Sequence, residues 1–93
     1  MNKNELVIAV ADAAAISRKD ADAAITAALD AITAALQEGE KVQLVGFGSF
    51  EVKKRNARIA RNPRTQEPME VPATIVPVFK PGKILKDAVA RLS

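Results

Sequence analysis

The chain has 93 residues, a net charge of +3 and a pI near 9.5, and it contains neither cysteine nor histidine. This length corresponds to one small domain, residues 1–93, and the composition excludes disulfides and a Cys/His zinc site as sources of stability. Eighteen residues are Ala and three are aromatic, so a single chain has little apolar area to bury. We expect a soluble intracellular protein that associates with a second copy, with no signal peptide and no membrane span.

The first 40 residues have the pattern of two helices. Asn2 followed by Glu5 is a capping-box signal, and Ser17 is a second N-cap signal. Apolar residues recur at helical spacing after each of them, and Gly39 is typical of a helix end. The predicted helices cover residues 3–14 and 18–38. We interpret residues 1–40 as a helical dimerisation base with a solvated acidic face.

From Lys41 onward the apolar residues alternate with polar ones, which is the period of a β-strand. Residues 45–50, VGFGSF, indicate a tight turn into a second strand. Residues 69–79 indicate a third strand, which Pro72 and Pro77 confine to a sheet edge or a bulge. A last helix is expected from its apolar residues, Ile84, Leu85, Ala88, Val89 and Leu92. The predicted fold class is α+β, with two N-terminal helices, a three-stranded antiparallel sheet that bears a protruding β-ribbon arm, and a C-terminal helix.

The charge is divided unevenly along the chain. Residues 1–40 carry three Lys or Arg against seven Asp or Glu, whereas residues 41–93 carry eleven against four. The second part therefore has a balance of +7. Such asymmetry predicts an anionic partner for residues 41–93, with nucleic acid as the first candidate.

The most basic segment lies between the second and third strands, at about residues 53–70. No acid occurs from Lys53 to Arg64, and the flanking strands would pair antiparallel. The simplest geometry is a two-stranded ribbon that projects from the sheet and turns near residues 62–66, a structure that is only marginally stable alone. Its cations would be attracted to phosphates, and Arg suits the narrow minor groove of A·T-rich DNA. They are Lys53, Lys54, Arg55, Arg58, Arg61 and Arg64.

Pro63, near the expected tip of the ribbon, has two interpretations. Asn-Pro is a common turn dipeptide, so Pro63 could simply form the turn. Architectural minor-groove proteins, however, insert compact apolar side chains between base steps and kink the duplex. The local residues alone leave both roles open.

Three motifs, LVGFGSF, RNPRT and VPVFKPGKILKDAV, occur in this order, and the chain opens with MNKNELV. Together they resemble the HU/integration host factor family of bacterial histone-like DNA-binding proteins, most closely its HU branch, over essentially the whole chain. The resemblance implies an intertwined dimer with a saddle of strands, two arms that embrace the DNA minor groove, and intercalation by Pro63. The chain departs from the family at Ala60 and Gln66, where glycine is common, so the tip is expected to turn differently.

Further candidate residues lie outside the arm. Lys80, Lys83 and Lys86 are expected to guide DNA along the flank by phosphate contacts, although a solvated helix face would also carry them. Lys3 is a weaker candidate of the same kind. The complete predicted DNA-binding set is Lys3, Lys53, Arg55, Arg58, Arg61, Asn62, Pro63, Arg64, Lys80, Lys83 and Lys86. The predicted dimer core contains Phe47, Phe50 and Phe79.

The sequence predicts a non-enzymatic homodimer that bends and compacts double-stranded DNA in the bacterial nucleoid, in the cytoplasm, with little sequence preference. No cofactor, metal or small-molecule substrate is expected, because the chain lacks the His, Cys and Tyr of the usual nucleophile–base pairs. The main alternative is a sequence-preferring DNA-bending subunit of the integration host factor branch. An RNA-binding protein, which usually stacks bases on exposed aromatic residues, and a purely structural dimer module remain further alternatives.

Overall fold

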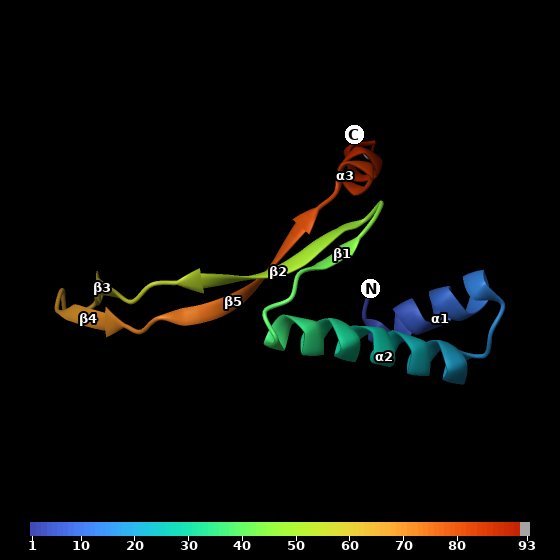
Figure 1. The fold of residues 1–93 in the computed structure, drawn as a ribbon, viewed down its shortest axis with the longest axis horizontal. Helices are drawn as coiled ribbons and strands as arrows, with labels where there is room; N and C mark the ends of the chain where they lie inside the picture. The colour runs from blue at the N-terminus through green and yellow to red at the C-terminus, as the bar shows by residue number, and fades with distance from the viewer. Residues whose placement is uncertain (92–93) are drawn as a thin grey trace. The chain divides into compact units, whose positions relative to one another are not determined.

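The structure, a computed structural model, describes residues 1–91; Leu92, expected in the last helix, lies outside the described residues. The chain divides into two units, Met1–Ala35 and the residues from Leu36 onward. The elements, coloured along the chain in Figure 1, are α1 (Lys3–Ala14), α2 (Arg18–Gln37), β1 (Val42–Leu44), β2 (Gly48–Arg55), β3 (Arg58–Arg61), β4 (Pro68–Val71), β5 (Thr74–Pro81) and α3 (Lys83–Ala90).

Both N-terminal helices begin where the capping signals predict. The Asn2 side chain accepts a hydrogen bond from the Glu5 N–H at 2.9 Å, and the Glu5 carboxylate accepts one from the Asn2 N–H at 3.4 Å. The Ser17 hydroxyl accepts a hydrogen bond from the N–H of Asp20 at 3.0 Å. These contacts satisfy amide groups that the first turn of a helix leaves without partners.

The two helices end in left-handed backbone conformations. Ala15 closes α1 with φ of 57°. Gly39 follows α2 with φ of 77° and donates to the carbonyl of Leu36 at 3.0 Å. Gly39 is thus a helix-ending residue as predicted, and α2 ends at Gln37, one residue before the predicted end. Left-handed geometry suits glycine but costs a residue with a Cβ about 1–2 kcal/mol, so Ala15 is under local strain.

The apolar centre of the first unit is small. Among the described residues the buried hydrophobic side chains are Val7, Ala11 and Ala21, with Val10 and Ile25 packed against them. Two of the three buried residues are Ala, and they contribute little buried area. The fold of a single chain therefore gains little from hydrophobic burial.

The larger sheet is antiparallel, with strand order β1-β2-β5. β2 pairs with β5 from Gly48 opposite Pro81 to Arg55 opposite Thr74. β5 is an edge strand, and its Pro77 therefore fits the predicted edge position. Gly48 is buried and needs to be glycine, because a Cβ there would lie 2.6 Å from the Lys80 carbonyl oxygen.

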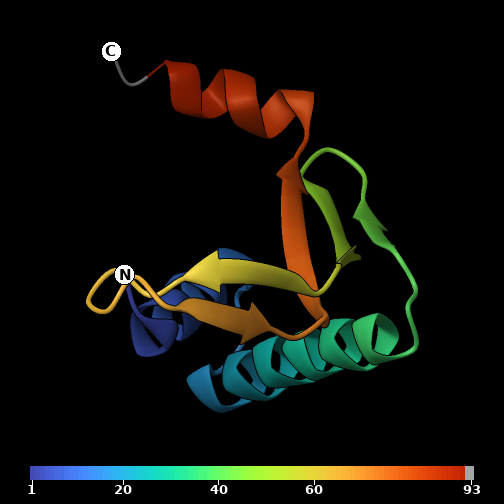
Figure 2. The same ribbon diagram turned by 90° about the vertical axis from the view of Figure 1, so that its left-hand side faces the viewer.

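A separate two-stranded sheet, β3-β4, continues beyond β2 and β5 and forms the arm. The prediction of one continuous strand at residues 69–79 is wrong, because the segment divides into β4 and β5 at Pro72 and Ala73. Proline cannot donate a ladder hydrogen bond, and Pro72 lies at the interruption. Figure 2 shows that the β3-β4 pair runs in a different direction from the β2-β5 pair.

α3 follows β5 directly, with Gly82 as its N-cap residue. The N–H of Gly82 donates to the carbonyl of Phe47 at 2.8 Å, which ties the start of α3 to the turn between β1 and β2. None of the helices in residues 1–91 is both long enough and apolar enough to cross a membrane.

Candidate nucleic-acid interface

The tip of the arm is closed by a compact set of hydrogen bonds. The N–H of Asn62 donates to the carbonyl of Glu67 at 2.9 Å, and the N–H of Gln66 donates to the carbonyl of Asn62 at 2.8 Å. The Asn62 side chain also accepts from the N–H of Arg64 at 2.9 Å, and the Thr65 hydroxyl accepts from the N–H of Glu67 at 3.3 Å. The turn predicted near residues 62–66 is confirmed.

Gln66 adopts φ of 63°. It keeps the left-handed conformation that a glycine would adopt with less strain, although the tip was expected to turn differently. Ala60, the other departure, lies within β3 opposite Met69 and has no left-handed conformation.

Pro63 lies in the turn itself and is exposed. It follows directly after Asn62, whose backbone and side chain hold the turn closed. A compact apolar ring therefore projects from the end of the ribbon, where it is free to contact another molecule.

The arginines of the ribbon point to both of its faces. Arg58 pairs with Val71 and Arg61 with Pro68; side chains alternate between faces along a strand, so residues three apart lie on opposite faces. Arg64 extends from the tip, and all three side chains are exposed. Within the described chain, no ion pair involves residues 53–71, so these charges are not neutralised by the arm's own acids.

The arm cations continue along β2. Lys53 pairs with Val76 and Arg55 with Thr74 in the ladder, so these two cations share one face of the strand. Both are exposed. The basic surface therefore runs from the tip toward the larger sheet.

Lys80 is not free, because its ammonium group lies 2.5 Å from a carboxylate oxygen of Glu51. Glu51 pairs with Val78, so Lys80 is its diagonal neighbour on the same face of the sheet. The hydrogen bond from Lys80 holds the pKa of the Glu51 carboxyl below its ordinary value of 4.5. The sequence interpretation missed Glu51, because residues 51 and 80 meet only through the register of β2 and β5.

Lys3 is also engaged within its own unit. Its ammonium group donates to the Thr26 hydroxyl at 2.8 Å and lies 3.6 Å from a carboxylate oxygen of Asp22. The side chains of Lys3 and Asp22 remain 51% and 59% exposed, so a phosphate can compete for the lysine. Asp22 and Thr26 were not predicted as its partners.

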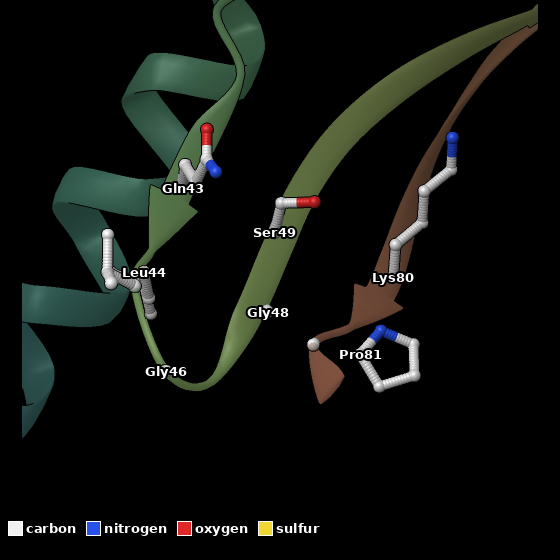
Figure 3. A pocket seen from close by; sticks show the side chains of 9 residues that line it. Gln43, Leu44, Gly46, Gly48, Ser49, Lys80 and Pro81 are labelled. Carbon is white, nitrogen blue, oxygen red and sulfur yellow. The ribbon is translucent and has the colours of Figure 1, made fainter. Parts of the chain in front are cut away.

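Lys83 and Lys86 lie one turn apart on the exposed surface of α3. Neither has an ion-pair partner among the described residues. An open hollow of about 260 Å³ lies between the β1–β2 turn and the end of β5. Ser49 and Lys80 are in its lining (Figure 3). Residues 1–91 contain no cluster of acidic, His or Cys side chains that could hold a metal ion.

The three phenylalanines form one cluster, with Phe50 and Phe79 on β2 and β5 and Phe47 in the turn before β2. The Phe79 ring centroid lies 4.9 Å from that of Phe50 and 5.6 Å from that of Phe47, and both pairs are tilted. Phe47 is nevertheless 47% exposed and Phe79 39% exposed. An aromatic cluster that remains this accessible in a single chain is incompletely covered.

Comparison with known proteins places the chain in a family. Residues 1–90 match the family described as bacterial DNA-binding protein, and the chain belongs to this family. It is 61% identical over 89 residues to DNA-binding protein HU of Geobacillus stearothermophilus, covering 96% of this chain and 99% of that protein. It is 58% identical over 90 residues to DNA-binding protein HU 1 of Bacillus subtilis, covering 97% and 98%.

Solved structures share the fold. The HU of an Anabaena HU-DNA cocrystal structure superposes with a TM-score of 0.91 at 57% identity, covering 97% of this chain and 98% of that one. HU from Thermotoga maritima gives a TM-score of 0.70 at 43% identity, covering 96% and 98%. These matches confirm the predicted resemblance and the combination of three helices with an antiparallel sheet.

Proposed function

We propose that the chain is an architectural DNA-binding protein that bends double-stranded DNA without catalysis. The observation that carries this proposal is the arm, a two-stranded ribbon with exposed arginines on both faces and an exposed proline at its tip. The similarity to proteins named DNA-binding protein HU, and to the HU of an HU-DNA cocrystal, supports the same function.

The arm fits the minor groove for a physical reason. A ribbon that lies in a groove has phosphates along both walls, and Arg58 and Arg61 point to opposite faces of the ribbon. Each phosphate that they neutralise releases counterions and favours binding on any sequence. Pro63 then inserts its ring between base pairs at the tip and stabilises a kink. Binding by charge and DNA deformability requires little sequence specificity.

The protein works as an intertwined homodimer in this proposal. The buried core of the described chain is limited to Val and Ala side chains, whereas Phe47 and Phe79 remain partly exposed. A second copy that covers these rings removes apolar area from water on both chains. Residues 1–40 would form the dimerisation base, and residues 41–93 would supply the sheet, the arm and the DNA-binding flank.

The flank extends the path of the DNA beyond the arm. Lys83 and Lys86 are exposed on α3 and have no acidic partner among residues 1–91, so they are suited to phosphate contacts that position the duplex. Lys80 and Lys3 join them when a phosphate displaces Glu51 and Asp22. A bent duplex can reach this flank, and the phosphate contacts that it makes there offset part of the free energy of bending the DNA.

The experiment is a binding titration of the wild type, Arg61→Ala and Pro63→Ala on intact, nicked and random-sequence duplexes at several salt concentrations. Arg61→Ala removes one cation per arm, so the salt slope should fall in magnitude by up to about 1.8 per dimer, since each phosphate contact contributes about 0.9. Pro63→Ala should leave the slope unchanged and reduce the bend angle measured by fluorescence transfer, most strongly on intact duplex. A wild-type protein whose affinity does not depend on salt, or that leaves DNA straight, contradicts the proposal.

A further inference from the structure

Gln66 is the one residue of the arm with a positive φ, at 63°. A non-glycine residue is seldom found in this region, where the Cβ is crowded against the backbone. Such an outlier is a reason to look for a function. The turn hydrogen bonds hold its backbone, but within residues 1–91 the Gln66 side chain has no hydrogen-bond or ion-pair partner and the residue is exposed, so no internal contact occupies the side chain.

Gln66 lies at the same end of the arm as Pro63. Its N–H donates to the carbonyl of Asn62, the residue directly before Pro63, at 2.8 Å. This bond holds the backbone of Gln66 across the turn from Pro63. A duplex that receives the proline ring therefore lies close to Gln66.

Among the neutral side-chain acceptors of the described tip, Gln66 is the one that accepts no internal hydrogen bond. The side-chain oxygen of Asn62 already accepts from the N–H of Arg64, and the hydroxyl of Thr65 accepts from the N–H of Glu67. Arginine side chains only donate. The carboxylate of Glu67 is an acceptor, but phosphates repel its charge. The Gln66 amide oxygen is thus a neutral acceptor that no other group of the described arm occupies.

The minor groove presents a matching group. Its base edges carry acceptors at every pair, and the 2-amino group of guanine is the donor that distinguishes G·C from A·T pairs. We propose that Gln66 accepts a hydrogen bond from a guanine 2-amino group beside the kink, while its amide N–H donates to a neighbouring acceptor of the groove floor. This inference rests on the proposed minor-groove function. It gives the arm a modest preference for guanine at the kink, in a ribbon whose arginines favour narrow A·T-rich grooves.

Inosine provides the test, because a duplex with inosine in place of guanine lacks only the 2-amino group. Wild type, Gln66→Gly and Gln66→Asn are titrated on matched duplexes that contain G·C or I·C pairs. Gln66→Gly removes the amide and tolerates the left-handed backbone, and Gln66→Asn retains a side-chain amide. Inosine also changes the flexibility of DNA, and this effect is the same for every variant. The measured quantity is therefore the ratio of the affinity for G·C to the affinity for I·C, compared between variants.

The ratio of the affinity for G·C to that for I·C should be about threefold higher for the wild type than for Gln66→Gly for each arm, and about tenfold higher for a dimer. This difference corresponds to one net hydrogen bond per arm. Gln66→Asn should give an intermediate ratio. The inference is overturned if Gln66→Gly binds both duplexes with the wild-type ratio, or if Gln66→Asn behaves like Gln66→Gly. Failure of every variant to bind either duplex would instead reject the proposed DNA-binding function.

Discussion

Replacing Glu51 by Gln should strengthen DNA binding and make it more dependent on salt. In the free protein the carboxylate of Glu51 lies 2.5 Å from the ammonium group of Lys80, so a phosphate must displace it before it can bind the lysine. Glu51→Gln keeps the size of the side chain and removes its charge. Lys80 is then available from the start.

The magnitude follows from the number of contacts. Where Glu51 keeps Lys80 from phosphate in the wild-type complex, Glu51→Gln adds one phosphate contact per protomer, which raises the magnitude of the salt slope by up to about 0.9, or up to about 1.8 for a dimer. Between about 50 and 200 mM salt, the affinity of Glu51→Gln should therefore fall up to about 12-fold more than that of the wild type. A fluorescence titration on one duplex at four salt concentrations measures both slopes.

Glu38 supplies a matched control. It is an exposed acid that follows α2, and no ion pair of the described residues involves it. Glu38→Gln removes the same charge without releasing a lysine, and the double variant Glu51→Gln/Lys80→Ala removes the lysine that is released. Equal slopes for Glu51→Gln and Glu38→Gln would refute the explanation.

Acidification should act like the substitution. The pKa of Glu51 is lowered, chiefly by the hydrogen bond from Lys80. The unfolded pKa of this carboxyl is near 4.5, and its pKa in the folded protein is lower. The ionised carboxylate therefore stabilises the fold above pH 4.5, and this contribution disappears as the pH falls through the folded pKa. The pair is therefore intact at neutral pH. The wild type and Glu51→Gln should converge in salt slope only below about pH 4.5.

Three further predictions concern stability. Ala15→Gly should raise Tm by about 4 °C, because glycine relieves the strain at φ of 57°; Ala9→Gly, at an exposed position inside α1, should lower Tm by a similar amount in the same thermal scan. Phe79→Ala should destabilise the dimer by about 3–5 kcal/mol in urea denaturation, and a loss below about 1 kcal/mol would show that no second copy covers the ring. Backbone amides of β3 and β4 should exchange with solvent faster than those of α2 in the absence of DNA; equal protection would contradict a marginally stable arm.

Several features of the fold were predictable because short segments of sequence determine them. The side chain of Asn2 caps its own helix, Ser17 does the same for α2, and Gly39 ends α2 through its own φ. The turn at residues 62–66 also depends on hydrogen bonds between neighbouring residues. The basic arm was predictable for a related reason, since twelve residues without an acid form a charged segment in any fold. The hypothesis that Pro63 acts as a wedge, in contrast, came from the resemblance to a family, because Asn-Pro alone is typical of a plain turn.

The tertiary structure decided which distant residues meet. The pairing of β2 with β5 places Phe50 opposite Phe79 and brings Glu51 to Lys80, and the packing of α1 on α2 brings Lys3 to Asp22. A one-residue change of register would move every side chain of a strand to the other face, so no local pattern could reveal these ion pairs. Lys80 and Lys3, which the sequence offered as candidates for DNA binding, therefore each lie beside a carboxylate in the free protein. Strand register and helix packing bring these groups together from segments about 20 to 30 residues apart.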